Sequence, residues 1–153
     1  MEQSGKQINS KQMIKKILHT GGYNNSIDIS LLLIRLIVGG FMLTHGFGKF
    51  LMLIGDGPIQ FADPIGIGTT ASLVLTVFAE FFCSIFLIFG VATRLSAIPL
   101  LITMLVAAFI VHANDGFGKQ ELALLYATTY LVLAISGAGK FSVDKWIYDR
   151  LRN

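Results

Sequence analysis

Long apolar stretches alternate with short polar segments along this chain. The stretches cover residues 29–54, 70–90, 95–113 and 121–138. A helix of about 18 or more apolar residues is long enough to cross a hydrocarbon core roughly 30 Å thick. In lipid, each backbone polar group needs a partner within its own segment, which favours helices. The pattern therefore predicts an all-α fold, a four-helix antiparallel transmembrane bundle with short connections.

Polar residues and glycines mark the ends of the predicted helices. Asp28 and Ser30 are expected to cap the first helix, and Gly55-Asp56-Gly57-Pro58 ends it. Gly90 ends the second helix, and Asn114-Asp115-Gly116 ends the third. The loop at residues 55–68 carries two charges among apolar residues. We expect this loop to fold over the mouth of the bundle.

The same pattern divides the chain into three parts. They are a leader at residues 1–27, a membrane domain at residues 28–139 and a basic tail at residues 140–153. In the leader, Ile14, Ile17 and Leu18 fall on one helical face, and in the tail Trp146 lies among basic residues. Segments of this kind lie at membrane surfaces. We expect both ends to be interfacial, with a helix that docks onto a partner protein as the alternative.

The composition supports contact with a lipid bilayer and excludes several other classes of protein. Of 153 residues, 54% are apolar and 14% are charged, whereas soluble domains average about 25% charged residues. An ordinary soluble enzyme is therefore excluded, and the apolar content is too high for a disordered chain. The single cysteine, Cys83, excludes an internal disulfide scaffold.

Lys and Arg residues are distributed unevenly between the two predicted sides of the membrane. Nine of the twelve lie on the side of the termini: Lys6, Lys11, Lys15, Lys16, Arg94, Lys140, Lys145, Arg150 and Arg152. Lys49 and Lys119 lie on the opposite side, and Arg35 lies within the first stretch. Because positively charged loops stay in the cytoplasm, we expect both termini there and a multi-pass protein of the cell membrane. No nucleic-acid partner is expected, since the basic residues follow the topology instead of forming a solvated patch.

Ionisable residues at membrane depth are the candidates for chemistry. Glu80 lies near the middle of the second stretch, where an acidic residue opposes insertion by about 2.5 to 3.5 kcal/mol. It must face the bundle interior and either bind a proton or meet a donor. Arg35 on the first helix is predicted to come within reach of Glu80. His45, Lys49, His112 and Glu121 are predicted to gather toward the outer mouth.

Two interpretations of these ionisable residues stay open. They either pair with one another and hold the helices in register, or form a proton path or a pocket for a polar small molecule. Two histidines, His45 and His112, raise the question of a haem held between helices, but hydrogen-bonded histidines are more common and haem is not expected. No metal site is predicted, because the chain lacks the C-x-x-C and H-E-x-x-H motifs.

A series of short motifs follows in a fixed order over about residues 30 to 145. They are Arg35 with Gly39 and Phe41, His45-Gly46, Lys49-Phe50, Phe61-Ala62, Glu80, Gly90 with Thr93-Arg94, Met104, Ala107-Ala108 with His112, Glu121, and Gly137-Ala138-Gly139-Lys140-Phe141-Ser142-Val143-Asp144. The order and spacing of these motifs resemble those of the DoxX family of small bacterial four-helix membrane proteins.

This resemblance implies a protein of the cytoplasmic membrane that, in some members, is a subunit linked to thiosulfate:quinone oxidoreductase or another redox complex. A quinone is then the candidate cofactor, and redox-complex subunits or a second copy of the chain are candidate partners. A fold does not establish catalysis, and a non-catalytic scaffold or a small-molecule or proton carrier is the alternative. The residues carried over as candidates for the polar site are Arg35, His45, Lys49, Glu80, Arg94, His112 and Glu121.

Overall fold

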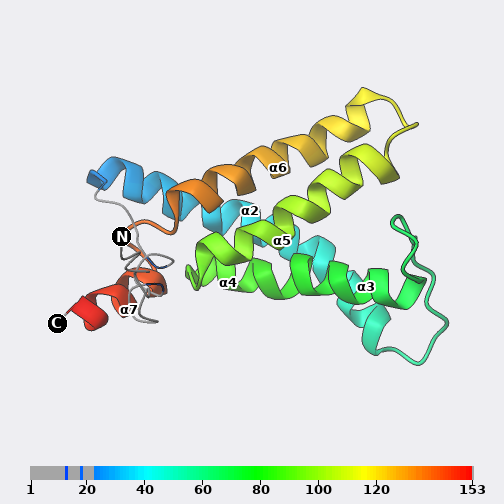
Figure 1. The fold of residues 1–153 in the computed structure, drawn as a ribbon, viewed down its shortest axis with the longest axis horizontal. Coiled ribbons are helices and arrows are strands. Elements are labelled where there is room, and N and C mark those ends of the chain that lie inside the picture. The colour runs from blue at the N-terminus through cyan, green and yellow to red at the C-terminus, as the bar shows by residue number, and fades with distance from the viewer. Residues whose placement is uncertain (1–12, 14–17, 19–22, 153) are drawn as a thin grey trace, which may run out of the picture.

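The computed structural model describes residues 13, 18 and 23–152, and within them every regular element is a helix (Figure 1). The elements are α2 (Asn25–Ile54), α3 (Thr69–Val77), the π-helix η1 (Phe78–Cys83), α4 (Ser84–Phe89), α5 (Thr93–Val106), the π-helix η2 (Ala107–Val111), α6 (Phe117–Ser136) and α7 (Val143–Arg152). The amphipathic segment predicted around Ile14, Ile17 and Leu18 lies, apart from Leu18, outside the described residues. The predicted all-α class is confirmed.

The helices combine into four long rods. These rods pack side by side, as Figure 1 shows. α2 and α6 are one rod each, α3 continues through η1 into α4, and α5 continues into η2. Their ends lie within four residues of the predicted apolar stretches. Three rods are long and apolar enough to cross a membrane: Asn25–Ile54, Thr69–Phe89 and Thr93–Val111. α6 has 20 residues, but its first turns carry Lys119, Gln120 and Glu121, and it is not among these three.

The two ends of the bundle differ. At one end, here called the loop end, residues 55–68 connect α2 to α3 and residues 112–116 connect η2 to α6. At the other, the tail end, α7 lies beside the short turn between α4 and α5 (Figure 1). Apolar side chains of all four rods are exposed, among them Phe41, Phe82, Phe109 and Ile135. This exposure fits a helical bundle surrounded by lipid.

The cap of α2 differs from the sequence prediction. Asn24 is the N-cap, and its side-chain oxygen accepts a hydrogen bond from the Ile27 amide at 3.0 Å. Asp28, predicted as a cap, is buried and accepts from the Lys140 amide at 2.8 Å. Ser30 donates to the Ser26 carbonyl at 2.9 Å. The prediction was wrong because the helix starts one turn earlier, which turns Asp28 toward the segment after α6.

Polar groups hold α7 to the tail end. The buried Asp144 carboxylate accepts from the Ala92 amide at 2.6 Å and the Thr93 amide at 2.9 Å, and so caps the start of α5. The Asp144 amide donates to the Gly90 carbonyl at 2.9 Å. Gly90 has a φ of 68°, and a side chain there would collide with the Arg35 guanidinium. Glycine is therefore required at this turn for both its conformation and its size.

The loop at residues 55–68 covers the loop end, as predicted. Phe61, Ala62 and Pro64 line a cavity together with Lys49 and Glu80 of the bundle. Asp63 ties the loop to α3 and accepts from the Ile67 amide at 3.0 Å, the Gly68 amide at 2.8 Å and the Ser72 hydroxyl at 2.8 Å. The hydrogen bond from Ser72, followed by the one from Gly68, lowers the pKa of the Asp63 carboxyl, because these donors favour its charged form.

We predict that Asp63→Asn lowers the thermal unfolding temperature of the protein in detergent at pH 7. The stabilisation by a carboxylate with a lowered pKa is complete above its unfolded-state pKa and is lost as the pH falls through its folded-state pKa. The difference between the wild type and Asp63→Asn should therefore stay constant from pH 7 to about pH 5 and shrink as the pH falls below about pH 4. Asp56→Asn, at an exposed carboxylate in the same loop, is the control. A difference that stays constant with pH would contradict this role of the charge.

Candidate functional site

The structure separates the predicted site residues into two groups. His45, Lys49, Glu80 and His112 line two neighbouring cavities at the loop end, and all of them except His45 line both. Arg35 and Arg94 lie toward the tail end, where Arg35 donates to the Phe141 carbonyl at 2.5 Å and Arg94 contacts the carbonyls of Ala134 and Ser136. The exposed Glu121 does not line either of these cavities.

Glu80 forms an ion pair with Lys49 at the centre of the loop-end group. The Lys49 ammonium donates to Glu80 Oε2, and the side chains of Glu80 and Lys49 are 5% and 28% exposed. The predicted pair of Glu80 with Arg35 is not formed. Arg35 lies 11 residues before Gly46, the α2 residue that contacts Glu80, which is about 16 Å along the helix axis. The register of the two helices therefore makes Lys49 the partner.

Gly46 brings the backbones of α2 and η1 into contact. A Cβ atom at residue 46 would lie 2.5 Å from the carbonyl carbon and oxygen of Glu80 and 2.7 Å from the Phe81 amide nitrogen. Glycine is the residue that permits such close approach of two backbones. Next to this contact, Phe50 stacks on Phe81 with ring centroids 4.5 Å apart. The position of Glu80 beside Lys49 thus depends on residue 46 being glycine, which has no side chain.

Two π-helical turns border the site. Glu80 lies inside η1, and His112 follows η2 directly, with its amide donating to the Ala107 carbonyl at 2.9 Å. Single π-helical turns within α-helices are rare and occur frequently at functional sites. The sequence did not predict these turns. A π-helical turn adds one residue to a helix, and in an almost uniformly apolar stretch an added residue leaves no visible change in the pattern.

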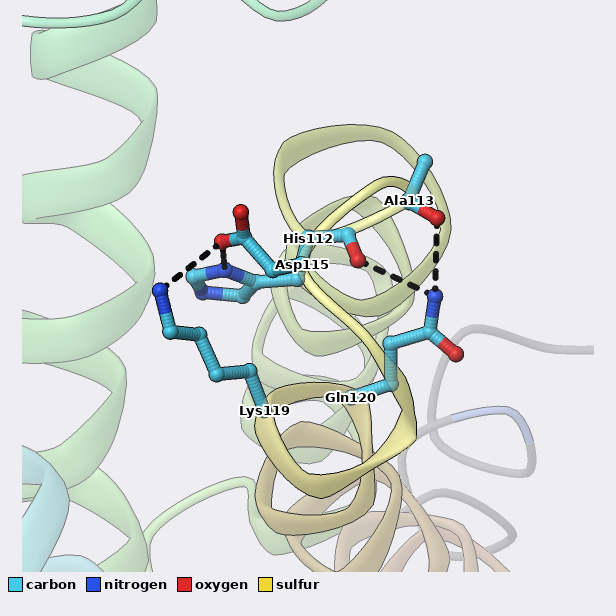
Figure 2. Close-up of polar contacts among 5 residues, drawn as sticks. All are labelled: His112, Ala113, Asp115, Lys119 and Gln120. Atoms are coloured by element: carbon cyan, nitrogen blue, oxygen red, sulfur yellow. Dashed lines mark hydrogen bonds and ion pairs between the residues drawn. The ribbon is translucent and has the colours of Figure 1, made fainter.

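His112 belongs to a polar cluster that the sequence prediction named only in part (Figure 2). Its Nδ1 lies 2.9 Å from Asp115 Oδ2, and Lys119 donates to the same oxygen at 3.3 Å. Gln120 donates to the backbone carbonyl of His112 at 3.0 Å. The hydrogen bond with His112, followed by the one with Lys119, lowers the pKa of the Asp115 carboxyl. The contact at Nδ1 orients the ring and leaves Nε2 available for a ligand.

Asp115 was missed as a site residue because it stands in the Asn114-Asp115-Gly116 sequence, which is typical of a turn. Its spacing from His112 and Lys119, at three and four residues, would have been a usable signal. Residues at such spacing have neighbouring side chains in a helical turn.

Two cavities flank the Lys49–Glu80 pair. The first has a volume of about 180 Å³, and the second, under the loop, has a volume of about 250 Å³. Lys49, Glu80, Ala107 and His112 line both. The first cavity is also lined by Met42, His45, Met104, Lys119, Leu122, Ala123 and Tyr126. An engineered cavity of about 150 Å³ holds benzene, so the first cavity is large enough for one small ring.

Tyr130 lies in the apolar core next to the first cavity. It is fully buried and packs in one cluster with Met42 and Met104, which also line the cavity. Its ring stacks on that of Tyr126 at 6.1 Å. Among the described side chains, none forms a hydrogen bond with the Tyr130 hydroxyl. The sequence prediction missed this residue, although a tyrosine four residues from another marks one face of a helix.

These features define a helical membrane protein with an ionisable site at one end of its bundle. The model of the DoxX family matches residues 30–113, and the chain belongs to this family. Within the described part of the chain, no three His, Cys, Asp or Glu side chains come together as a metal site requires. No solved structure matches the chain.

Curated relatives match most of the chain. "Putative oxidoreductase CatD" of Bacillus subtilis is 29% identical over 131 residues, which are 85% of this chain and 96% of the relative. "Inner membrane protein YqjF" of Escherichia coli is 29% identical over 122 residues, 77% of this chain and 92% of the relative. "Uncharacterized membrane protein Rv3486" of Mycobacterium tuberculosis is 30% identical over 152 residues, 88% of each chain. The predicted family and membrane character are confirmed.

We predict that Gly46→Ala reduces the free energy of unfolding in detergent by about 1 to 3 kcal/mol, because the added methyl group forces the backbones of α2 and η1 apart. Gly48→Ala is the matched control, since a Cβ there meets no atom within 4 Å. Alanine in an open helical position is stabilising by about 0.5 to 1 kcal/mol. Equal unfolding temperatures for the two variants would show that the contact at Gly46 is not needed.

Proposed function

We propose that this DoxX-family protein is a membrane subunit of a quinone-linked redox system, in which the loop-end cavities bind the quinone head group. The observation that carries this proposal is the arrangement of Lys49, Glu80 and His112 between two cavities, the first of which is large enough for one small ring. A relative whose printed name includes "oxidoreductase" adds support.

The residues around the cavities suit the chemistry of a quinone. Reduction to the quinol takes up two electrons and two protons, and both carbonyl oxygens accept hydrogen bonds during it. Lys49 and His112 offer nitrogen donors, and the Lys49 ammonium, whose charge the Glu80 carboxylate stabilises, carries a proton that it could give to a reduced ring. In this proposal a partner subunit supplies the electrons, while this chain binds the ring, orients it and provides protons.

We further propose four spans with both termini in the cytoplasm, so that the loop end faces outward. The nine-to-two distribution of Lys and Arg supports this orientation. The exposure of Leu122, Leu125, Leu131 and Ile135 supports a membrane location for α6 despite its polar first turns. Trp146 of α7 is exposed and contacts Arg150, an arrangement that suits a helix lying at the cytoplasmic surface of the membrane.

A second candidate function is a non-catalytic scaffold or a small-molecule or proton carrier. It is favoured by the ion pair itself, because Lys49 and Glu80 neutralise each other without any ligand. In that case the pair serves to hold α2 and η1 in register. The two candidates differ in whether the protein binds a quinone and whether removing both charges weakens that binding.

The topology is tested by single cysteines in a Cys83→Ala background. We expect Gln60→Cys and Asn114→Cys to react with an impermeant maleimide added to intact cells, and Gly5→Cys and Asn153→Cys to react only after the cells are opened. The positive residues at the tail end determine this result. Labelling of Asn153→Cys but not of Gly5→Cys in intact cells would show that α6 does not cross the membrane, and labelling of both would show the opposite orientation.

Quinone binding is tested with the double variant Lys49→Met with Glu80→Gln, which removes both charges and leaves neither unpaired. A charge-assisted hydrogen bond contributes about 1.5 to 3 kcal/mol, so the affinity for a tail-free benzoquinone should fall about tenfold or more. The control Glu121→Gln, an exposed carboxylate outside both cavities, should change it by less than about twofold. Thermal unfolding of all variants is measured alongside. A wild-type protein that binds no benzoquinone, with a double variant that unfolds at a lower temperature, would favour the scaffold.

A further inference from the structure

An apolar groove of about 260 Å³ runs between α2 and α6 beside the first cavity. Its walls include Ile37, Val38 and Phe41 from α2 and Leu122, Leu125 and Tyr126 from α6. Four of these side chains, those of Ile37, Phe41, Leu122 and Leu125, are exposed on the surface of the bundle. In a membrane protein such a surface faces the lipid chains, so the groove is open to the bilayer.

The groove and the first cavity adjoin. Leu122 and Tyr126 line both, so that one surface of α6 continues from the apolar groove into the ionisable cavity. On α2 the same change occurs along the helix: Ile37, Val38 and Phe41 line the groove, and Met42, His45 and Lys49 line the cavity. A molecule with a polar head and an apolar tail would meet matching surfaces in this order.

The order also agrees with the direction of a lipid in a bilayer. The ionisable residues lie near the loop end, since Lys49 is close to the end of α2 and Lys119 is close to the start of α6. Groove residues such as Ile37 and Thr129 lie nearer the middle of their helices. From Lys49 to Ile37 the helix extends about 18 Å. A ligand in the leaflet at the loop end would place its head in the cavity and its tail toward the bilayer midplane.

We propose that the ligand is a quinone with an isoprenoid tail that enters sideways from the bilayer between α2 and α6. Its ring occupies the first cavity and its tail lies in the groove. This inference rests on the proposed function and adds the class of substrate and its route. Because lipid chains are as apolar as the tail, the groove provides shape complementarity and little hydrophobic free energy. The groove therefore selects ligands by shape, and filling it excludes the tail sterically.

The experiment fills the groove with a larger side chain. Leu125→Trp places an indole among the groove residues, and Leu131→Trp places one at an exposed position of the same helix that does not line the groove. Native mass spectrometry of the full chain in detergent measures binding of a benzoquinone with two isoprene units and of the same benzoquinone without a tail. Thermal unfolding checks that both variants remain folded.

We expect Leu125→Trp to weaken binding of the tailed benzoquinone by about tenfold and to leave that of the tail-free form unchanged, whereas Leu131→Trp changes neither. Unchanged binding of the tailed form, or an equal loss of both forms, would overturn the groove assignment while leaving the proposed function standing. A different outcome is a wild type that carries a bound phospholipid, which is lost in Leu125→Trp and which the tailed quinone does not displace. That result would show that the occupant of the groove is a phospholipid and not a quinone. If the wild type binds neither benzoquinone, the proposed function fails together with this inference.

Discussion

The ion pair between Lys49 and Glu80 is the interaction on which the arrangement of the loop end depends. A carboxylate in the middle of an apolar helix is tolerated when it faces the bundle interior and has a partner. Meeting that requirement sets the register of α2 against η1, and the missing side chain of Gly46 allows the close approach. The two cavities lie on either side of the pair, so their walls follow from the same register.

At the tail end, buried charged side chains form hydrogen bonds with the backbone instead of with each other. Arg35 is fully buried and donates to the carbonyl of Phe141, while Asp144 caps the start of α5. These contacts join the first helix, the turn at Gly90 and α7. The charges there hold chain segments together, whereas those at the loop end surround open space. This contrast is the reason that the candidate site comprises His45, Lys49, Glu80 and His112 and leaves out Arg35 and Arg94.

The cavities and the groove suggest how a polar site can be reached within a membrane protein. The loop at residues 55–68 covers the second cavity from above, whereas the apolar groove between α2 and α6 opens to the side. The cavity beside Lys49 would accommodate a polar head group, and the groove would leave an apolar tail among the lipid chains. The Asp115 carboxylate, shared by His112 and Lys119, keeps the imidazole in place at the mouth of the cavities.

The amino-acid sequence by itself determined the helical class, the ends of the rods to within four residues and the family. It could do so because long apolar stretches between glycine-rich turns have few alternatives in lipid. The sequence also identified His45, Lys49, Glu80 and His112 as candidates, since ionisable residues stand out in such stretches. The tertiary structure alone decided that Glu80 pairs with Lys49 instead of Arg35, that Asp28 binds the segment after α6, and that π-helical turns lie beside the site. Register and rotation depend on the packing of one helix against another, and a nearly uniform apolar pattern carries little information about either.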